Sequence, residues 1–361
     1  MAVHTAQSIR PRRAGVEIVP FGLLANGVRA NLYVLSNGNG IEARITNYGA
    51  TVVSLTVPDR RRQLADVALG FDDLDGYVRT RAFFGAAIGR YANRIAGGRF
   101  ILDNNNYTLA TNNGTNHLHG GVQGFDKAIW IAQETRRRDA VVLRYRSAHG
   151  EEGYPGNLDV EVSYALTRDD ALRIDYSAST DRPTPVNLTN HCFFNLGNDA
   201  DILDHELKIV AERFTPIDES LIPTGELRAV AGTPFDFRTP ARIGARIDAD
   251  DAQLKRAGGY DHNFILAKKN GRLDVAAEVY DRKSGRAMRV LTTEPGLQFY
   301  SGNFLDGSII GKNRKAYTRR SGFCLEAQHY PDSPNQPHFP STILMPGDIY
   351  RQTTIYQFAT L

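Results

Sequence analysis

Hydrophobic and polar residues alternate along much of this chain. In LDVEVSYALT (158–167) and ALRIDYSAST (171–180), every second residue is mainly apolar, and a short RDD turn separates the two segments. A period of two is typical of a strand with one buried face, so we predict an antiparallel hairpin here. The same pattern predicts two further hairpins and two single strands, over 31–49, 274–294, 140–148 and 349–358.

Helical patterns are scarce by comparison. The best candidate is DDAQLKRAGG (250–259), which has an acidic start and a glycine stop but is short. The 33 glycines and 16 prolines punctuate many alternating segments, and no linker or repeat interrupts them, which predicts an all-β fold: one large antiparallel β-sandwich with few short helices. We expect residues 16–361 to form a single domain and residues 1–15 to be a flexible N-terminal segment.

The charge balance is nearly even. The 43 basic and 40 acidic residues give a net charge of +3, which does not indicate nucleic-acid binding. We expect the basic clusters 60–62 and 136–138 to lie in solvated loops or hairpin ends. A run of about eighteen apolar residues does not occur, so we expect no membrane span. Cys192 and Cys324 lie in separate apolar runs, which is typical of buried free thiols in a reducing, cytoplasmic protein.

Sequence motifs for cofactor chemistry are missing. The chain has no dinucleotide-binding G-x-G-x-x-G before a helix, no Walker loop, no G-x-S-x-G and no H-E-x-x-H, so we expect no cofactor. In NHLHGG (116–121), His117 and His119 have the i, i+2 spacing that places two side chains on one face of a strand. Such a pair can ligate a metal, but further ligands with clear spacing are missing, and we expect no metal site.

Two ionisable residues lie within apolar segments. His191 directly precedes Cys-Phe-Phe in VNLTNHCFFNLG (186–197), and Glu326 follows Phe-Cys-Leu in SGFCLEAQHYP (321–331). A buried ionisable group needs a partner or changes its protonation state. From these residues alone two alternatives stay open: a core histidine and a water-facing glutamate, or groups that transfer protons.

Other polar residues lie between glycines or beside aromatic residues. They are Asn93 and Arg94 in GRYANRIAGGRF, Asp261 and His262 in GGYDHNF, and Gln298 in EPGLQFYSGNF. Amide, carboxylate and guanidinium groups match the hydroxyls of a pyranose, and aromatic rings cover its apolar face. We expect a sugar-binding site, although each segment also fits a turn capped by polar side chains.

Seven segments in order make the chain resemble the aldose 1-epimerase (galactose mutarotase) family from about residue 16 to the C-terminus. They are GRYANRIAGGRF, NHLHGGVQGFDKAIW, EEGYPGNLDVEVSYALT, NLTNHCFFNLG, GYDHNF, GLQFYSGNFLDG and GFCLEAQHYPDSPNQPHFP. The resemblance implies a β-supersandwich that needs no cofactor and interconverts the α and β anomers of D-glucose- and D-galactose-type aldohexoses. The implied partner is a small-molecule aldohexose, and we expect a monomer or homodimer without nucleic-acid or membrane partners.

The resemblance also implies residue roles. Glu326 corresponds to the base and His191 to the acid, and the implied sugar contacts are Asn93, Arg94, His119, Asp261 and Gln298. A small hydroxyl residue and then a tyrosine are expected after the acid histidine, whereas this chain has Cys192 and Phe193. We also expect Glu294 to place an additional carboxylate near the cleft.

Anomer interconversion needs both an acid and a base. Ring opening removes a proton from the C1 hydroxyl and adds one to the ring oxygen, and reclosure after rotation about C1–C2 reverses both transfers. We expect a nearby carboxylate, Glu326 or Asp261, to keep His191 protonated. We expect Arg94 or His119 to keep Glu326 ionised.

Three other functions stay open from the sequence. A non-catalytic carbohydrate-binding protein needs no acid–base pair, and a glycoside hydrolase uses two carboxylates at the scissile bond. A hexose-6-phosphate 1-epimerase needs basic residues at the rim of the cleft.

Overall fold

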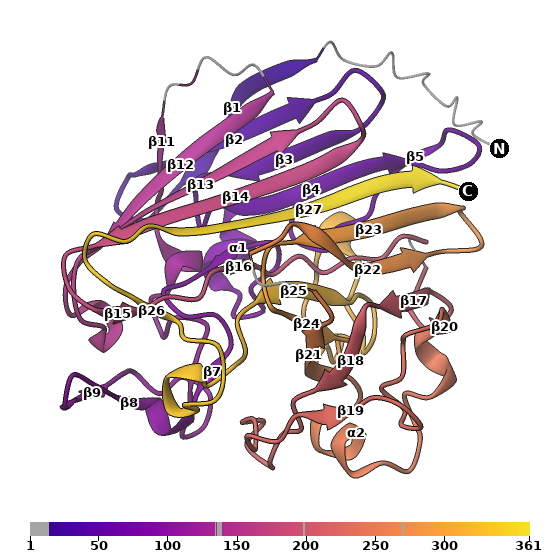
Figure 1. Cartoon of the computed structure of the whole chain (residues 1–361). Helices are drawn as coiled ribbons and strands as arrows, with labels where there is room; N and C mark the ends of the chain where they lie inside the picture. Colours follow the sequence, from indigo (N-terminus) through magenta and orange to yellow (C-terminus); the bar gives the residue numbers. More distant parts are fainter. Residues whose placement is uncertain (1–13, 134, 136–138, 198, 269–270) are drawn as a thin grey trace.

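The computed structural model of the protein describes residues 14–133, 135, 139–197, 199–268 and 271–361, and most of its regular structure is β-strand (Figure 1). Most of the expected flexible N-terminal segment, and the basic cluster 136–138, lie outside these residues. The other basic cluster, 60–62, lies exposed in the turn between two strands, as expected.

The largest sheet is antiparallel and has nine strands in the order β11-β12-β13-β14-β27-β23-β22-β17-β20. In that order the strands are Ile131–Gln133, Ala140–Ser147, Leu158–Leu166, Ala171–Thr180, Tyr350–Thr360, Arg286–Thr292, Asp274–Tyr280, Glu206–Ile209 and Ala241–Arg242. The predicted hairpins β13–β14 and β22–β23, and the predicted single strands β12 and β27, are confirmed.

Two five-stranded sheets complete the main architecture. The first, β1-β2-β3-β4-β5, contains the predicted hairpin β2–β3, and its strands are Gly15–Leu23, Arg29–Ser36, Glu42–Thr46, Thr51–Pro58 and Leu64–Asp66. The second has the order β19-β18-β21-β24-β25, and its strands are Arg228–Ala229, Ala211–Phe214, Asp261–Leu266, Gly296–Tyr300 and Cys324–Gln328.

Both smaller sheets pack against the nine-stranded sheet. The hydroxyl of Tyr164 in β13 donates to the carbonyl of Ala50 at 2.6 Å, just before β4, and that of Tyr356 in β27 donates to the carbonyl of Leu325 in β25 at 3.2 Å. One buried apolar cluster includes residues from all three sheets. The nine-stranded sheet therefore backs both smaller sheets, with β13 against the first and β27 against the second (Figure 1). The expected β-sandwich class is confirmed.

Helices are short, as predicted. Helix α2 (Ala252–Ala257) begins after Asp251, whose carboxylate accepts the backbone N–H groups of Gln253 and Leu254, and it ends at Gly258 with φ of 67°. Helix α1 (Leu74–Arg79) was not predicted, because six residues are too few to show a helical period and, unlike α2, it ends at Thr80 without a glycine stop.

Four pairs of short strands hold the loops beneath the sheets. They are β6–β16 (Ala87–Ile88, Thr189–Asn190), β7–β10 (Arg94–Ile95, His117–Leu118), β8–β9 (Arg99–Leu102, Asn105–Thr108) and β15–β26 (Thr184–Pro185, Ile343–Leu344).

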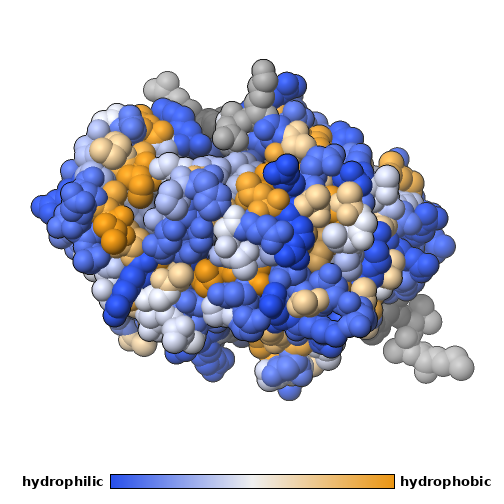
Figure 2. All heavy atoms as spheres, turned by 60° about the horizontal axis from the view of Figure 1, so that its bottom comes forward, coloured by the Kyte–Doolittle hydropathy of each residue, from blue (hydrophilic) through white to orange (hydrophobic). Residues whose placement is uncertain are grey.

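The state of the cysteines and the polarity of the helices and surface match the expectations from the composition. Cys192 and Cys324 are buried free thiols, as predicted. Within the described residues, every helix is too short or too polar to cross a membrane. The face in Figure 2 is largely hydrophilic, with hydrophobic residues in separate patches.

The packing of the nine-stranded sheet gives a stability prediction. Leu143 in β12 is fully buried, so Leu143→Ala should lower the free energy of unfolding by about 2–5 kcal/mol, through lost burial and a residual cavity. Urea unfolding followed by circular dichroism measures this change. The neighbouring Arg144 is exposed, and Arg144→Ala should cost no more than about 1 kcal/mol; equal effects of the two changes would contradict the packing assigned here.

Candidate active site

Three neighbouring strands of the second five-stranded sheet present polar side chains together. Asp261 is the first residue of β21, Gln298 lies in β24 and Glu326 lies in β25. The antiparallel register places Gln298 directly opposite Glu326, and Asp261 opposite Tyr300. Residues directly opposite each other on a ladder have neighbouring side chains, so Glu326 lies beside Gln298. Gln298 also bonds the carboxylate of Asp261 and so links the two carboxyl groups.

The histidine side of the site comes from the short strand pairs. His191 directly follows β16, and its backbone N–H donates to the carbonyl of Ala86 at 3.0 Å, while its carbonyl accepts from Gly85 at 2.9 Å. Because β16 pairs with β6, these bonds fix the position of His191 beside the 83–94 segment. Segments about a hundred residues apart in the sequence therefore meet here.

Asn93 and His119 hold each other through a reciprocal pair of contacts. The backbone N–H of His119 donates to the carbonyl of Asn93, and the backbone N–H of Asn93 donates to Nδ1 of His119, both at 3.1 Å. Both residues have positive φ, 63° and 51°. The residue after His119 must be glycine, because Gly120 has φ of 87° and a Cβ there would lie 1.7 Å from the carbonyl oxygen of Gly89.

These segments surround a cavity of about 560 Å³. Six of the seven predicted site residues line it, namely Asn93, Arg94, His119, His191, Asp261 and Glu326. Aromatic rings from Phe83, Phe193, Tyr300 and Phe304 also line it. Polar groups beside aromatic faces are the chemistry expected for a monosaccharide.

His191 and Glu326 lie close together at this cavity. Nε2 of His191 is 3.7 Å from Oε1 of Glu326, and the two side chains are 7% and 2% exposed. The second carboxyl oxygen of Glu326, Oε2, is buried and has no hydrogen-bond partner among the described residues. Buried polar atoms are normally paired, so the described residues leave the hydrogen-bonding capacity of this carboxyl group incompletely satisfied.

Burial favours the neutral forms of this pair. It lowers the pKa of His191 to about 4, and it raises the pKa of Glu326 well above its ordinary value. Asp261 raises the pKa of Glu326 further, and the opposing effect of Arg94 is smaller. Our expectation of an imidazolium beside a carboxylate is therefore wrong for the sugar-free site, because desolvation outweighs the nearby charges.

Asp261 is held from two sides. Nε2 of Gln298 donates to its Oδ1 at 2.7 Å, and Nη1 of Arg94 lies 3.9 Å from its Oδ2. The guanidinium of Arg94 is itself oriented by Asn113, whose Oδ1 accepts from Nε at 3.0 Å. Gln298 thus contacts Asp261 but is not among the residues that line the cavity. Its direct contact with sugar stays a prediction.

Two further expectations from the sequence were wrong. His117 and His119 do not share a face: His117 bonds the carbonyl of Ala110 at 2.7 Å and the hydroxyl of Tyr154 at 2.6 Å, as a buried structural histidine. The positive φ of His119 breaks the strand period there. Glu294 does not line the cavity, because its carboxylate pairs with His329 outside it.

The histidines also bear on metal binding. Ligand atoms of His119, His191 and Glu326 lie within 4.8 Å of one another. However, Nδ1 of His119 accepts the N–H of Asn93, so in the neutral ring the proton is on Nε2, which then has no free electron pair for a metal. This tautomer disfavours a metal at these residues, and the absence of a metal stays a prediction.

Several site residues were not found from the sequence. Phe83 contacts the rings of His119 and His191 with centroid distances of 4.8 and 5.8 Å, but it lies in the apolar segment RAFFGAA, which resembles ordinary core. Sγ of Cys324 lies 3.7 Å from Nδ1 of His191. The sequence did contain a signal for the contact of Cys324: it lies two residues before Glu326, so in a strand both side chains are on one face.

Comparison with known proteins identifies the family. The family model for aldose 1-epimerase matches residues 31–357. This chain belongs to the aldose 1-epimerase family. A galactose mutarotase from Bos taurus is 48% identical and covers 87% of this chain and 90% of its own, and an aldose 1-epimerase from Escherichia coli is 42% identical with coverages of 93% and 97%. The solved galactose 1-epimerase from Lactobacillus acidophilus is similar, with a TM-score of 0.85, 29% identity and coverages of 96% and 99%. The resemblance inferred from the seven segments is confirmed.

The ionisation of His191 in this family member can be measured directly. Because its pKa is lowered to about 4, its ring should be neutral at pH 6 and titrate near pH 4 in the sugar-free protein. The unfolded chain binds more protons than the folded one between that value and the ordinary value of 6.5, so this residue lowers stability as the pH falls through that range. Ring NMR resonances, assigned with His191→Asn, measure the midpoint, and a midpoint at or above 6.5 would contradict the burial effect.

Proposed function

We propose that this aldose 1-epimerase interconverts the α and β anomers of D-glucose- and D-galactose-type aldohexoses, with Glu326 as base and His191 as acid. The reaction class follows from the family. The observation that carries the residue assignment is the buried pair of Glu326 and His191, 3.7 Å apart and both lining one cavity.

The protonation states of the pair suit this reaction. A neutral carboxylic acid beside a neutral imidazole holds the same number of protons as a carboxylate beside an imidazolium. A bound sugar favours the second form, because the C1 hydroxyl donates to the carboxylate of Glu326 and the ring oxygen accepts from the imidazolium of His191. Glu326 then removes the hydroxyl proton as His191 protonates the ring oxygen, and the C1–O5 bond opens. After rotation about C1–C2, Glu326 returns its proton to the C1 oxygen, His191 takes its proton back from O5, and the C1–O5 bond forms again.

The remaining polar groups would hold the sugar while C1 rotates. Arg94 and His119 offer N–H donors, and Asp261 offers acceptor oxygens. His119 presents Nε2–H in the tautomer set by Asn93. The aromatic residues would cover the apolar face of the ring, and binding through hydroxyls far from C1 leaves the reacting bond free to move.

Removing the base is the first test. Glu326→Gln keeps the shape and removes the proton acceptor, so kcat should fall about 10²-fold or more. Polarimetry on freshly dissolved α-D-galactose and α-D-glucose, corrected for the spontaneous rate in buffer, measures this loss. Glu161→Gln, a matched change in β13 on the half-exposed partner of Arg144, should leave the rate unchanged. A Glu326→Gln enzyme with most of its activity would mean that another group is the base.

Gln298 tests the sugar-binding side. Gln298→Ala removes the donor that holds Asp261, so the KM for hexose should rise about tenfold or more while kcat changes less. Steady-state polarimetry separates the two constants. Gln328→Ala removes another buried glutamine, in β25, that does not line the cavity, and should leave KM unchanged. A fall in kcat alone for Gln298→Ala would contradict a role in ground-state binding.

A further inference from the structure

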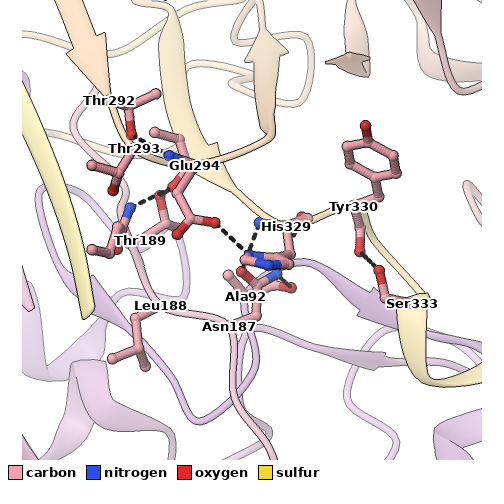
Figure 3. A network of polar contacts seen from close by, with 12 residues as sticks. Ala92, Asn187, Leu188, Thr189, Thr292, Thr293, Glu294, His329, Tyr330 and Ser333 are labelled. Carbon is pink, nitrogen blue, oxygen red and sulfur yellow. Dashed lines mark hydrogen bonds and ion pairs between the residues drawn. The ribbon is translucent and has the colours of Figure 1, made fainter. Parts of the chain in front are cut away.

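Outside the cavity, a second histidine–carboxylate pair lies at the end of the catalytic strands. The ladder between β24 and β25 ends where Gly296 pairs with Gln328. Just beyond it, Nδ1 of His329 lies 2.5 Å from Oε2 of Glu294, and the two side chains are 22% and 3% exposed (Figure 3). The pair therefore connects the segment entering the strand of Gln298 with the segment leaving the strand of Glu326.

The same histidine is tied to the segment that carries the acid. Oδ1 of Asn187 accepts the backbone N–H of His329 at 2.9 Å, and Nδ2 of Asn187 donates to the carbonyls of His329 and Ala92 at 3.3 and 3.2 Å. Figure 3 shows Asn187 and Ala92 directly beside His329. Asn187 is four residues before His191, so its side chain fixes the start of that segment against β25.

Thr189 makes a second link between these segments. Its Oγ1 donates to the carbonyl of Ala327 at 2.8 Å. Thr189 lies two residues before His191, and Ala327 directly follows Glu326. Glu294 is anchored in turn to the nine-stranded sheet, since its backbone N–H donates to Oγ1 of Thr292 in β23 at 3.1 Å.

We propose that Asn187, Thr189, Glu294 and His329 form a positioning brace that sets the separation between the carboxyl group of Glu326 and the imidazole of His191. None of these four is among the described residues that line the cavity, so they act through the acid and the base and not on the sugar. Glu294 opposes the effect of burial and raises the pKa of His329, which strengthens the contact between them. This inference rests on the catalytic roles proposed above.

Variants of His329 and Thr189 test the brace. His329→Leu removes the donor to Glu294, and kcat should fall about 10- to 100-fold, the range expected when reacting groups shift by up to about 1 Å, with KM changed little. His329→Asn places an amide N–H where Nδ1 lies, and should recover most of kcat. Thr189→Val keeps the shape of the side chain and removes the bond to Ala327, so it should also lower kcat with little change in KM. It carries the test if His329→Leu does not fold.

Leu143→Ala is the control for lost stability. It weakens packing in the nine-stranded sheet, and it should lower the melting temperature without lowering the kcat of folded enzyme. The brace is overturned if folded His329→Leu and Thr189→Val keep the wild-type kcat, if they raise KM alone, or if Leu143→Ala lowers kcat as much. These results leave the proposed function intact when Glu326→Gln is inactive, whereas an active Glu326→Gln enzyme contradicts the proposed function itself.

Discussion

The candidate active site depends on burying a carboxyl group and an imidazole side by side. Leaving water disfavours the charged form of each group, so burial moves both toward neutrality. Proton transfer to and from a sugar needs the charged forms to be reachable when the sugar is bound. In the proposed mechanism the cavity combines the two conditions, because Arg94 and Asp261 line it beside the pair and a bound sugar would add hydrogen bonds to the charged forms. On this proposal, Glu326 and His191 rest neutral and exchange protons with the sugar only once it is bound.

Two parts of the fold meet to build this pair. Glu326 belongs to a strand in the interior of the molecule, backed by the nine-stranded sheet through the bond from Tyr356 to Leu325. His191 belongs to an irregular segment that is held by short strand pairs and single hydrogen bonds. Sheet registers fix positions well because a slip by one residue reverses every side chain. The segment of His191 has only the two-residue register of β16 with β6, and the side chains of Asn187 and Thr189 also tie it to β25 and the residue after it.

The sequence predicted the fold class well because alternation is strong where one face of a strand is buried, as in β13 and β14. It predicted six cavity residues through family motifs, since each motif contains its own polar group. It did not predict the ionisation of Glu326 and His191, because the cost of burial depends on the surroundings in space. Phe83 was missed for a similar reason: an apolar residue gives the same pattern in a core and in a binding cavity. The pairing of Glu294 with His329 joins residues 35 positions apart, beyond the reach of any local pattern.

The contact of Cys324 with His191 affects how strongly the imidazole holds a proton. The thiol of Cys324 lies next to Nδ1, and sulfur is a weak hydrogen-bond acceptor. In many proton-transfer sites a carboxylate occupies that position and holds the positive ring in place. Here the ring gains little from sulfur when it is charged, so an imidazolium formed beside the sugar would be a stronger acid than one held by a carboxylate, and it would also be harder to form. In the proposed mechanism the bound sugar, and not the sulfur atom, must therefore stabilise the charged ring before the C1–O5 bond opens.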